Sequence, residues 1–254
     1  MGSESEPVAV VILAAGLGKR MKSDKAKVLH SILGRPMILY VVDTALAVAG
    51  ENVILVVGHQ ADEVQATVAK QTDVKYAFQP EQLGTGHAVM CALPAVPEGI
   101  RHVVILCGDV PLLGRHTLQR FVDDHRSNHR TLSVLAVHLA DPTGYGRVIR
   151  KGDNHVTGIV EEADATQEEK AIQLVNTGIY CIERQFLETA LQRIEADNAQ
   201  GEYYLTDIVG LAHEAHRKIG ITVGENPDEF VGINSREQLK TVEGVMRHNR
   251  AELA

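Results

Sequence analysis

Two adjoining segments near the N-terminus decide the fold: the apolar run Val8-Ala-Val-Val-Ile-Leu13 and the loop Ala14-Ala-Gly-Leu-Gly-Lys-Arg-Met21. A short apolar run that ends in small and polar residues is typical of a buried β-strand. The amphipathic stretch 37–48 follows this loop and predicts a helix. Strand, loop and helix in this order form the first part of a βαβ unit, which predicts a parallel sheet.

The same alternation continues through the first half of the chain. The runs 53–57, 74–78 and 103–106 are apolar, and the stretches 62–70 and 87–93 between them are amphipathic. Strands that alternate with helices predict an α/β fold, a Rossmann-like, mostly parallel twisted sheet with helices on both faces. Ligands of such folds gather outside the carboxyl ends of the strands, so we expect the functional loops to follow strands.

The pattern changes after about residue 140. Segments 144–151, 155–161 and 173–182 predict less regular, partly antiparallel strands around glycine and aspartate turns. Helical periodicity returns at 185–196, 205–216 and 236–247, with a short strand at 219–223. We therefore expect a flexible tail at 1–6 and one continuous domain over 7–254, in which the later strands form one wall of the site.

Composition narrows the class of protein. The 254 residues are 44% hydrophobic, which is enough for one large core or two modest ones. No apolar run approaches the roughly 20 residues of a membrane-spanning helix, so we expect a cytoplasmic protein without a membrane partner. The formal charge of −8 disfavours a nucleic-acid partner. Cys91, Cys107 and Cys181 lack paired spacing, which predicts reduced thiols.

The loop after the first strand has the composition of a phosphate-binding loop. Its small residues let backbone N–H groups approach phosphate oxygens, while Lys19, Arg20, Lys25 and Lys27 supply positive charge. A dinucleotide fingerprint needs glycine where Met21 stands, and a P-loop needs Ser or Thr where Arg20 stands. Taken alone, the loop also fits a glycine turn with solvated cations.

Several blocks, taken together, resemble the nucleotidylyltransferases that make sugar nucleotides. The first is Leu13-Ala-Ala-Gly-x-Gly-x-Arg-Met21, followed by Lys27-Val-Leu-His30. Six further blocks are similar, in order and spacing, to the uridylyltransferase half of the bacterial bifunctional N-acetylglucosamine-1-phosphate uridyltransferases. They are Gln79-Pro-Glu-Gln-Leu-Gly-Thr-Gly-His-Ala88, Gly108-Asp-Val-Pro-Leu112, Asp141-Pro-Thr-Gly-Tyr-Gly-Arg147, Gly158-Ile-Val-Glu-Glu162, Asn176-Thr-Gly-Ile179 and Gln200-Gly-Glu-Tyr-Tyr-Leu-Thr-Asp-Ile208. The resemblance covers residues 8 to about 245.

The resemblance implies the nucleotide-diphospho-sugar transferase fold, with a nucleotide-binding lobe at about 7–115 and a smaller, mixed-strand, sugar-binding lobe at about 140–235. It implies transfer of a uridylyl group from UTP to N-acetylglucosamine 1-phosphate, with release of pyrophosphate. Arg20 and Lys27 are the implied catalytic cations, which hold the triphosphate. The implied nucleotide-binding residues are Leu13, Ala14, Ala15, Gly16, Gly18, Gln79, Gly84, Thr85 and Gly108.

Mg²⁺ is the implied cofactor, because it prefers oxygen ligands and bridges phosphates with only one or two protein groups. Its implied ligands are Asp109 and Asn234. Alone, Asn234 would be interpreted as the N-cap of a helix that begins near Ser235, and the two roles can coexist. The implied sugar-binding residues are Gly146, Glu161 and Asn176.

Two positions depart from the family pattern. Ala26 replaces a usual proline, which we expect to leave a looser loop, and Cys107 replaces a usual aromatic residue, which removes packing near the ligand. Two alternatives stay open: a nucleotidylyltransferase for another sugar 1-phosphate or base, and a non-catalytic UDP-sugar-binding regulatory protein. The hexapeptide repeats of the bifunctional family are not found in this chain, so no acetyltransferase activity is expected, and the oligomeric state stays open.

Overall fold

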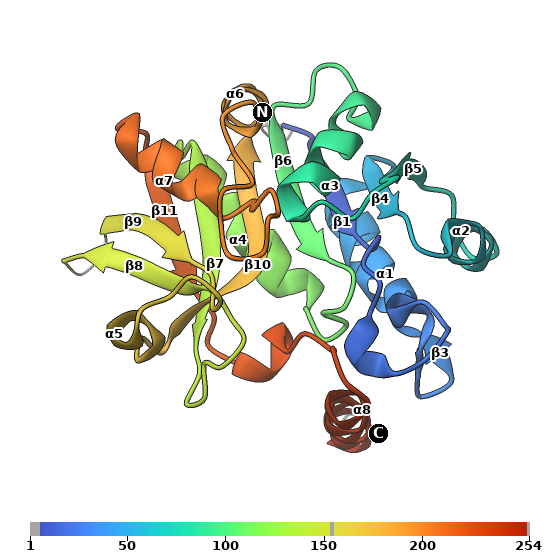
Figure 1. The fold of residues 1–254 in the computed structure, drawn as a ribbon. Coiled ribbons are helices and arrows are strands. Elements are labelled where there is room, and N and C mark those ends of the chain that lie inside the picture. Colours follow the sequence, from blue (N-terminus) through green and yellow to red (C-terminus); the bar gives the residue numbers. More distant parts are fainter. Residues whose placement is uncertain (1–5, 153–154, 253–254) are drawn as a thin grey trace.

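A nine-stranded sheet forms the centre of the computed structural model, which describes residues 6–152 and 155–252 (Figure 1). The expected tail at 1–6 lies outside the described residues except for Glu6. The sheet strands are β1 (Val8–Leu13), β4 (Val53–Val57), β5 (Lys75–Phe78), β6 (His102–Cys107), β7 (Leu132–His138), β8 (Arg147–Lys151), β9 (His155–Val160), β10 (Leu174–Glu183) and β11 (Ile219–Val223). A separate two-stranded hairpin consists of β2 (Ser31–Ile32) and β3 (Arg35–Pro36).

The strand order confirms a mostly parallel sheet. The main path runs β11-β7-β10-β6-β1-β4-β5, and β1 is parallel to both β4 and β6. β10 is antiparallel to both of its neighbours, β6 and β7, and β8 and β9 form an antiparallel pair beside it. The second half of the chain therefore contains the antiparallel strands that its sequence predicts.

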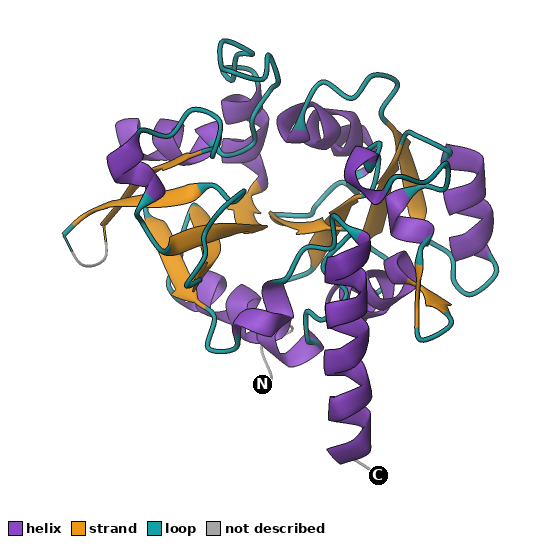
Figure 2. Cartoon of the chain, turned by 60° about the horizontal axis from the view of Figure 1, so that its bottom comes forward, coloured by secondary structure: helices purple, strands orange, loops and turns teal. Residues whose placement is uncertain are grey.

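Helices cover both faces of the sheet (Figure 2). The helices are α1 (Met37–Ala49), α2 (Ala61–Ala69), α3 (Thr85–Ala92), α4 (Arg115–Ser127), α5 (Gln167–Lys170), α6 (Arg184–Leu191), α7 (Asp207–Glu214) and α8 (Arg236–Glu252). Side chains alternate along a strand, so Val8, Val10 and Ile12 pack with α1, α2 and α4, while Ala9 and Val11 pack with α3, α6 and α7. The first strand is thus buried on both sides and holds two cores together.

The structure contains two elements that the sequence did not predict and one helix that is shorter than expected. The sequence patterns described above predict no element between residues 107 and 140, but α4 and β7 both lie there. β7 is an interior strand of the sheet, between β10 and β11. The predicted helix 185–196 was also too long, because α6 ends at Leu191. Among the described residues, no helix is both long enough and apolar enough to cross a membrane.

Candidate functional site

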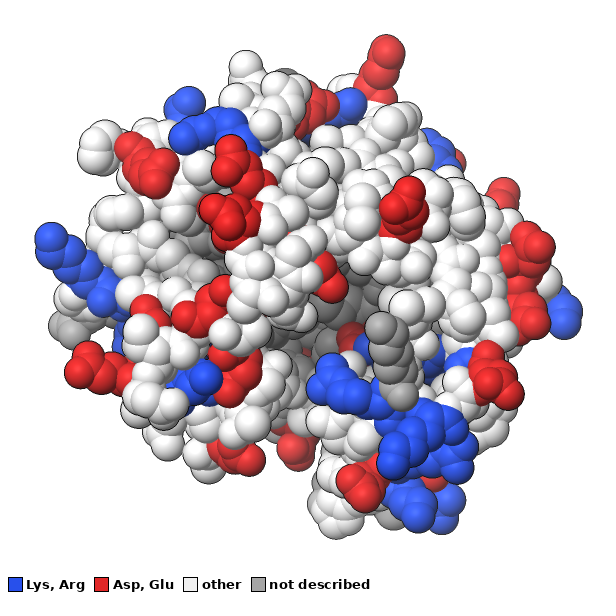
Figure 3. Space-filling model, in the orientation of Figure 1, with Lys and Arg blue, Asp and Glu red and all other residues white. Residues whose placement is uncertain are grey.

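A cleft of about 480 Å³ lies at the carboxyl ends of the parallel strands. Leu13 ends β1, Cys107 ends β6 and Gln79 follows β5, so all three reach the cleft from strand ends. Figure 3 shows the cleft as a hollow at the centre of one face, with Lys and Arg gathered on its lower right rim. Twelve of the predicted residues line it: Leu13, Ala14, Ala15, Gly16, Gly18, Arg20, Lys27, Gln79, Gly84, Thr85, Asp109 and Asn234.

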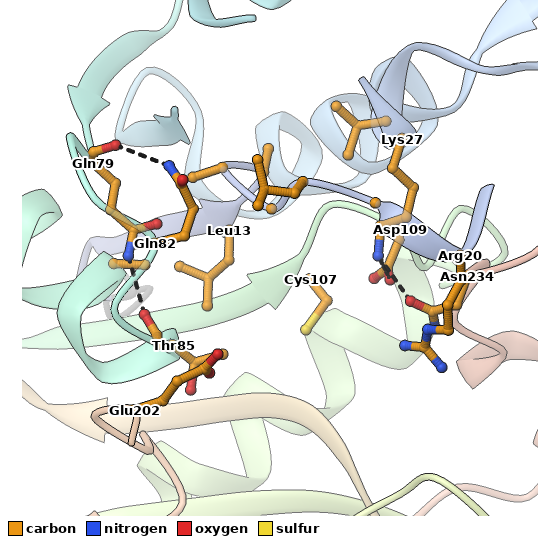
Figure 4. Close-up of a pocket in the computed structure, with 18 residues that line it drawn as sticks. Leu13, Arg20, Lys27, Gln79, Gln82, Thr85, Cys107, Asp109, Glu202 and Asn234 are labelled. Carbon is orange, nitrogen blue, oxygen red and sulfur yellow. Dashed lines mark hydrogen bonds and ion pairs between the residues drawn. The ribbon is translucent and has the colours of Figure 1, made fainter. Parts of the chain in front are cut away.

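One end of the cleft carries three charged or polar groups that meet at a single atom (Figure 4). The Lys27 Nζ donates to Asp109 Oδ2 at 2.6 Å and to Asn234 Oδ1 at 3.0 Å. The side chains of Lys27 and Asp109 are only 17% and 14% exposed. Arg20 lies beside this group and its side chain is exposed. Asp109 lies 82 positions and Asn234 lies 207 positions after Lys27 in the sequence, yet both present an oxygen atom to the Lys27 ammonium.

The start of α8 fixes Asn234. The backbone N–H of Gln238 donates to Ser235 Oγ at 3.2 Å, and the N–H of Ser235 donates back to Gln238 Oε1 at 3.0 Å. This is a capping box, so the N-cap is Ser235. Asn234 as the N-cap was therefore a wrong interpretation. Its carboxamide is available to Lys27, and the N–H of Ile233 donates to the Asp109 carbonyl at 2.9 Å, which aligns the two loops.

The N-terminal loop approaches Lys27 closely because of one glycine. Gly18 has a φ of +61°, and a Cβ atom there would stand 2.7 Å from the Lys27 Cβ. Arg236 fixes the next turn of the loop, because its guanidinium donates to the Met21 carbonyl at 3.2 Å and to the Lys22 carbonyl at 3.3 Å. The side chain of Lys19, which we expected to supply charge, lies outside the described part of the structure.

The opposite end of the cleft contains amide groups. Gln79 is 3% exposed, and its Nε2 donates to the Gly84 carbonyl at 3.1 Å. Gly84 has a φ of +111°, and a Cβ there would stand 2.6 Å from the Tyr203 carbonyl oxygen. Gln82 and Glu202 also line this end and had no predicted role. Leu13 and Cys107 lie between the two ends (Figure 4).

The segment around Tyr203 closes on the loop that carries Gly84. The Gly86 N–H donates to the Tyr203 carbonyl at 2.8 Å, and the Tyr203 N–H donates to the Leu83 carbonyl at 2.8 Å. The Thr85 hydroxyl accepts from the Leu205 N–H at 3.0 Å. The Thr85 side chain therefore holds the loop to the second half of the chain.

The predicted sugar-binding residues form a group of their own, which is not part of the cleft lining. The Asn176 N–H donates to the Gly146 carbonyl at 2.8 Å, and a Cβ on Gly146 would stand 3.2 Å from the Glu161 Oε2. Gly178, two residues after Asn176, lies close to the cleft-lining Cys107, because a Cβ on Gly178 would stand 2.7 Å from the Cys107 Sγ. Gly108 also lies behind the lining, with its N–H on the Leu13 carbonyl at 2.9 Å.

Two titratable groups near the sugar-side residues are shifted by burial. Burial raises the pKa of Glu161, although a hydrogen bond from the Thr206 hydroxyl at 3.0 Å opposes the shift. Burial, and then the Asp109 carboxylate, raise the pKa of Cys107 to about 12, so its thiol stays protonated and unreactive at neutral pH. Glu162 instead forms an ion pair with Arg147 at 2.7 Å, so the adjacent carboxylates have different partners.

Two further observations bear on ligands and on thiol chemistry. Cys91, Cys107 and Cys181 are all free thiols. Within the described residues, no group of three or more His, Cys, Asp or Glu side chains is arranged to hold a metal ion. The two oxygen atoms that contact the Lys27 Nζ belong to one carboxylate, Asp109, and one carboxamide, Asn234.

Comparison with known proteins gives consistent matches. The chain is 48% identical over 242 residues to the bifunctional protein GlmU of Syntrophotalea carbinolica, which covers 95% of this chain and 52% of that protein. It is 47% identical over 240 residues to the bifunctional protein GlmU of Geotalea uraniireducens, covering 94% of this chain and 52% of that protein. It is 42% identical over 247 residues to the bifunctional protein GlmU of Desulfotalea psychrophila, covering 97% of this chain and 73% of that protein.

The chain thus spans about half the length of most of these curated relatives. A family profile described as nucleotidyl transferase matches residues 9–225, which include β1 except for Val8, the N-terminal loop, Lys27 and Asp109. The fold, the cleft at the strand ends and this match over most of the chain lead to one conclusion: the protein belongs to the nucleotidyl transferase family.

Proposed function

We propose that the chain transfers a uridylyl group from UTP to N-acetylglucosamine 1-phosphate, which gives UDP-N-acetylglucosamine and pyrophosphate. The observation that carries this proposal is the two-ended cleft. A lysine, a carboxylate and a carboxamide meet at one end, and the buried amide of Gln79 and the half-buried amide of Gln82 line the other. The similarity to bifunctional GlmU proteins over 95% of the chain supports the same chemistry.

Positioning and charge neutralisation carry such a reaction, because the sugar phosphate is already a nucleophile. A phosphate oxygen of the sugar phosphate attacks the α-phosphorus in line, and the bond from that phosphorus to the oxygen bridging to the β-phosphate breaks. Pyrophosphate leaves with the bonding electrons. We assign to Arg20 and Lys27, which both line the cleft, the roles of holding the triphosphate and of stabilising the negative charge that develops on the leaving group.

The end of the cleft that contains Lys27, Asp109 and Asn234, called the cation end below, has side chains that fit Mg²⁺. Asp109 and Asn234 offer one carboxylate and one carbonyl oxygen, and both already contact one cationic atom, the Lys27 Nζ. Mg²⁺ takes hard oxygen ligands, typically one or two protein groups together with waters and substrate phosphates. When bound, Mg²⁺ neutralises the phosphates of the nucleotide. We propose that Asp109 and Asn234 hold it.

We assign base recognition to Gln79 and the backbone at Gly84 and Thr85. A glutamine amide offers a donor and an acceptor to a uracil edge, and Gly84 and Thr85 line the same end of the cleft. Gly146, Glu161 and Asn176 are assigned to the sugar. Gly178, two residues after Asn176, lies against Cys107, which lines the cleft. The division into a nucleotide-binding lobe at 7–115 and a sugar-binding lobe at 140–235 is part of this proposal, as is a cytoplasmic location, which suits three free thiols.

The proposal is tested by Mg²⁺-dependent release of pyrophosphate from UTP, with N-acetylglucosamine 1-phosphate, glucose 1-phosphate and glucosamine 1-phosphate assayed in parallel. We expect release with the first sugar phosphate. Release only with another would keep the chemistry and change the substrate. Binding of UDP-sugar without turnover for any of the three would contradict catalysis and favour a regulatory protein.

Single substitutions at the cation end test the reaction centre. We expect Lys27→Ala and Asp109→Ala each to lower kcat/KM by a hundredfold or more, about 3 kcal/mol of transition-state stabilisation. Lys240→Ala, at an exposed position of α8, is the control and should retain parental turnover. Retention of activity within about tenfold in Lys27→Ala or Asp109→Ala would show that the reaction occurs elsewhere.

A further inference from the structure

We propose that Gln60 is a positioning residue for Lys27, because its carboxamide holds the segment that leads into the lysine. The proposal rests on the role of Lys27 in the proposed function. Gln60 does not line the cleft. Within the described residues, its side chain forms hydrogen bonds with Asp24 and Ala26 and none with Lys27. It acts on the backbone of residues 24–26 instead.

Both ends of the Gln60 carboxamide bind the same short segment. The Gln60 Nε2 donates to the Asp24 carbonyl at 2.7 Å, and the backbone N–H of Ala26 donates to the Gln60 Oε1. Ala26 is 2% exposed, and Lys27 begins a short 3-10 helix directly after it. Two hydrogen bonds from one planar group thus fix the position from which the Lys27 side chain starts.

The anchor itself is attached to the sheet. Gln60 lies in the connection between β4 and α2, next to the N–H of Ala61, which donates to the Gly58 carbonyl at 3.2 Å. β4 pairs with β1, the strand that leads into the N-terminal loop. The Gln60 carboxamide therefore connects the loop to a neighbouring strand end, across 34 positions of sequence.

The backbone at Gln60 adopts a conformation that glutamine rarely takes. Its φ is +53° and its ψ is +43°, in the left-handed region that favours glycine. A glycine here would relieve the backbone but would provide no carboxamide. The two hydrogen bonds of the Gln60 side chain explain why glutamine stands at a position whose backbone conformation favours glycine.

The proposal distinguishes the loss of a constraint from the loss of a chemical group. Ala26 has a φ of −50° and a ψ of 135°, which lies within the range of proline. A proline at position 26 restricts the same backbone without needing its N–H. If Gln60 acts by holding this segment, Ala26→Pro should replace its effect.

We would compare the parent, Gln60→Gly, Ala26→Pro and the double variant. Gln60→Gly should lower kcat for pyrophosphate release about tenfold, with little change in KM for the sugar phosphate, because Lys27 acts on the triphosphate. Hydrogen exchange in peptides covering residues 22–29 should become faster. Ala26→Pro alone removes the N–H that Gln60 Oε1 accepts and places the proline ring against that oxygen, so it should also lose activity. The double variant has no side chain in that space and should recover most of the kcat that Gln60→Gly loses.

His129→Gly is the matched control. His129 also has a left-handed φ, +47°, and is exposed at the end of α4, so glycine relieves the same kind of strain far from the loop. It should change neither kcat nor exchange at 22–29. Parental exchange and kcat in Gln60→Gly, or a failure of Ala26→Pro to restore the kcat of a folded Gln60→Gly, would overturn the proposal. A parent without turnover would refute the proposed function, whereas the exchange comparison would still decide whether Gln60 holds the segment.

Discussion

At the scale of single residues, the Lys27 ammonium occupies the position between two oxygen atoms that we assign to a metal ion. It lies 2.6 Å from Asp109 Oδ2 and 3.0 Å from Asn234 Oδ1. A divalent cation and an ammonium group repel each other at such distances. If Asp109 and Asn234 hold Mg²⁺ as we propose, Lys27 would compete with the metal for the same oxygen atoms.

This competition predicts that Lys27→Met binds divalent cations more tightly than the parent in the absence of nucleotide. We expect a gain of tenfold or more in affinity for Mn²⁺, measured by electron paramagnetic resonance, together with a loss of turnover. Lys240→Met removes the same charge from an exposed position and should leave the affinity unchanged. Weaker binding in Lys27→Met would show that the lysine supports the metal ligands rather than competing with them.

The residues of the site differ in how far the sequence predicts them. The resemblance brings Lys27, Asp109 and Asn234 into one list, and the structure brings them to one atom, but their roles stay predictions. Gln60 was missed because its partners are backbone atoms that only the fold brings near it. Ala26 was expected to leave a loose loop, whereas its N–H is bound by Gln60.

At the scale of elements, the first turn of α8 determines where Asn234 points. Ser235 and Gln238 cap the helix, and the N–H of Asn234 also donates to the Gln238 Oε1 at 2.7 Å. The Ser-x-x-Gln spacing of a capping box is visible in the sequence and is the signal that identifies Ser235 as the cap. The cap of α8 thus supports the side chain that we propose as a metal ligand.

Ser235→Ala should therefore have two effects. Loss of the cap should lower the free energy of unfolding by about 1 kcal/mol, and the less well fixed Asn234 should weaken Mn²⁺ binding several-fold. Thr166→Ala removes a capping box at α5, outside the cleft lining, and is the control. Urea denaturation and Mn²⁺ titration of both variants should show similar destabilisation but weaker metal binding in Ser235→Ala only. Equal metal affinities would separate the cap from the site.

The elements of the first half were predictable because each apolar run and each amphipathic stretch is local. α4 and β7 were missed although α4 buries Leu118, Phe121, Val122 and His125, which follow helical spacing within a charged segment. The antiparallel placement of β10 between β6 and β7 was beyond a local pattern, because pairing partners are decided by tertiary contacts.

At the scale of the whole molecule, one end of the sheet borders the cleft and the other contains a group of buried histidines. β6 ends at Cys107 in the cleft and begins at His102, which is buried at the other end. The His102 Nδ1 lies 3.1 Å from the His125 Nε2, and the His125 Nδ1 lies 2.9 Å from Ser133 Oγ. These contacts join β6, α4 and β7 through uncharged rings.

Burial, and then repulsion from His102 when that ring is protonated, lower the pKa of His125 to about 3. The unfolded chain binds this proton below about pH 6.5. The folded protein buries His125 without this proton, so its free energy of unfolding has its full value above about pH 6.5. That free energy falls as the pH drops from about 6.5 toward 3, by up to about 1.4 kcal/mol per pH unit. The charged groups that influence His125 are His102, Arg130, Arg126 and Asp124.

Urea denaturation at pH 7.0 and 5.5 measures this dependence. The parent should lose stability over this interval, and His125→Gln, which cannot be protonated, should lose less. His116→Gln, at an exposed position of α4, should follow the parent. The same slope in all three proteins would mean that His125 does not carry the dependence.

The hydrogen bonds between the Leu83–Gly86 loop and the Tyr203–Leu205 segment have a consequence for redesign. The loop assigned to the base is closed by residues from the half assigned to the sugar, and Gly84 and Gly86 leave no room between them. The two specificities are therefore not interchangeable modules. A chimera that replaces one half must carry the matching face of the other, and a graft of residues 83–86 alone would meet a partner shaped for a different loop.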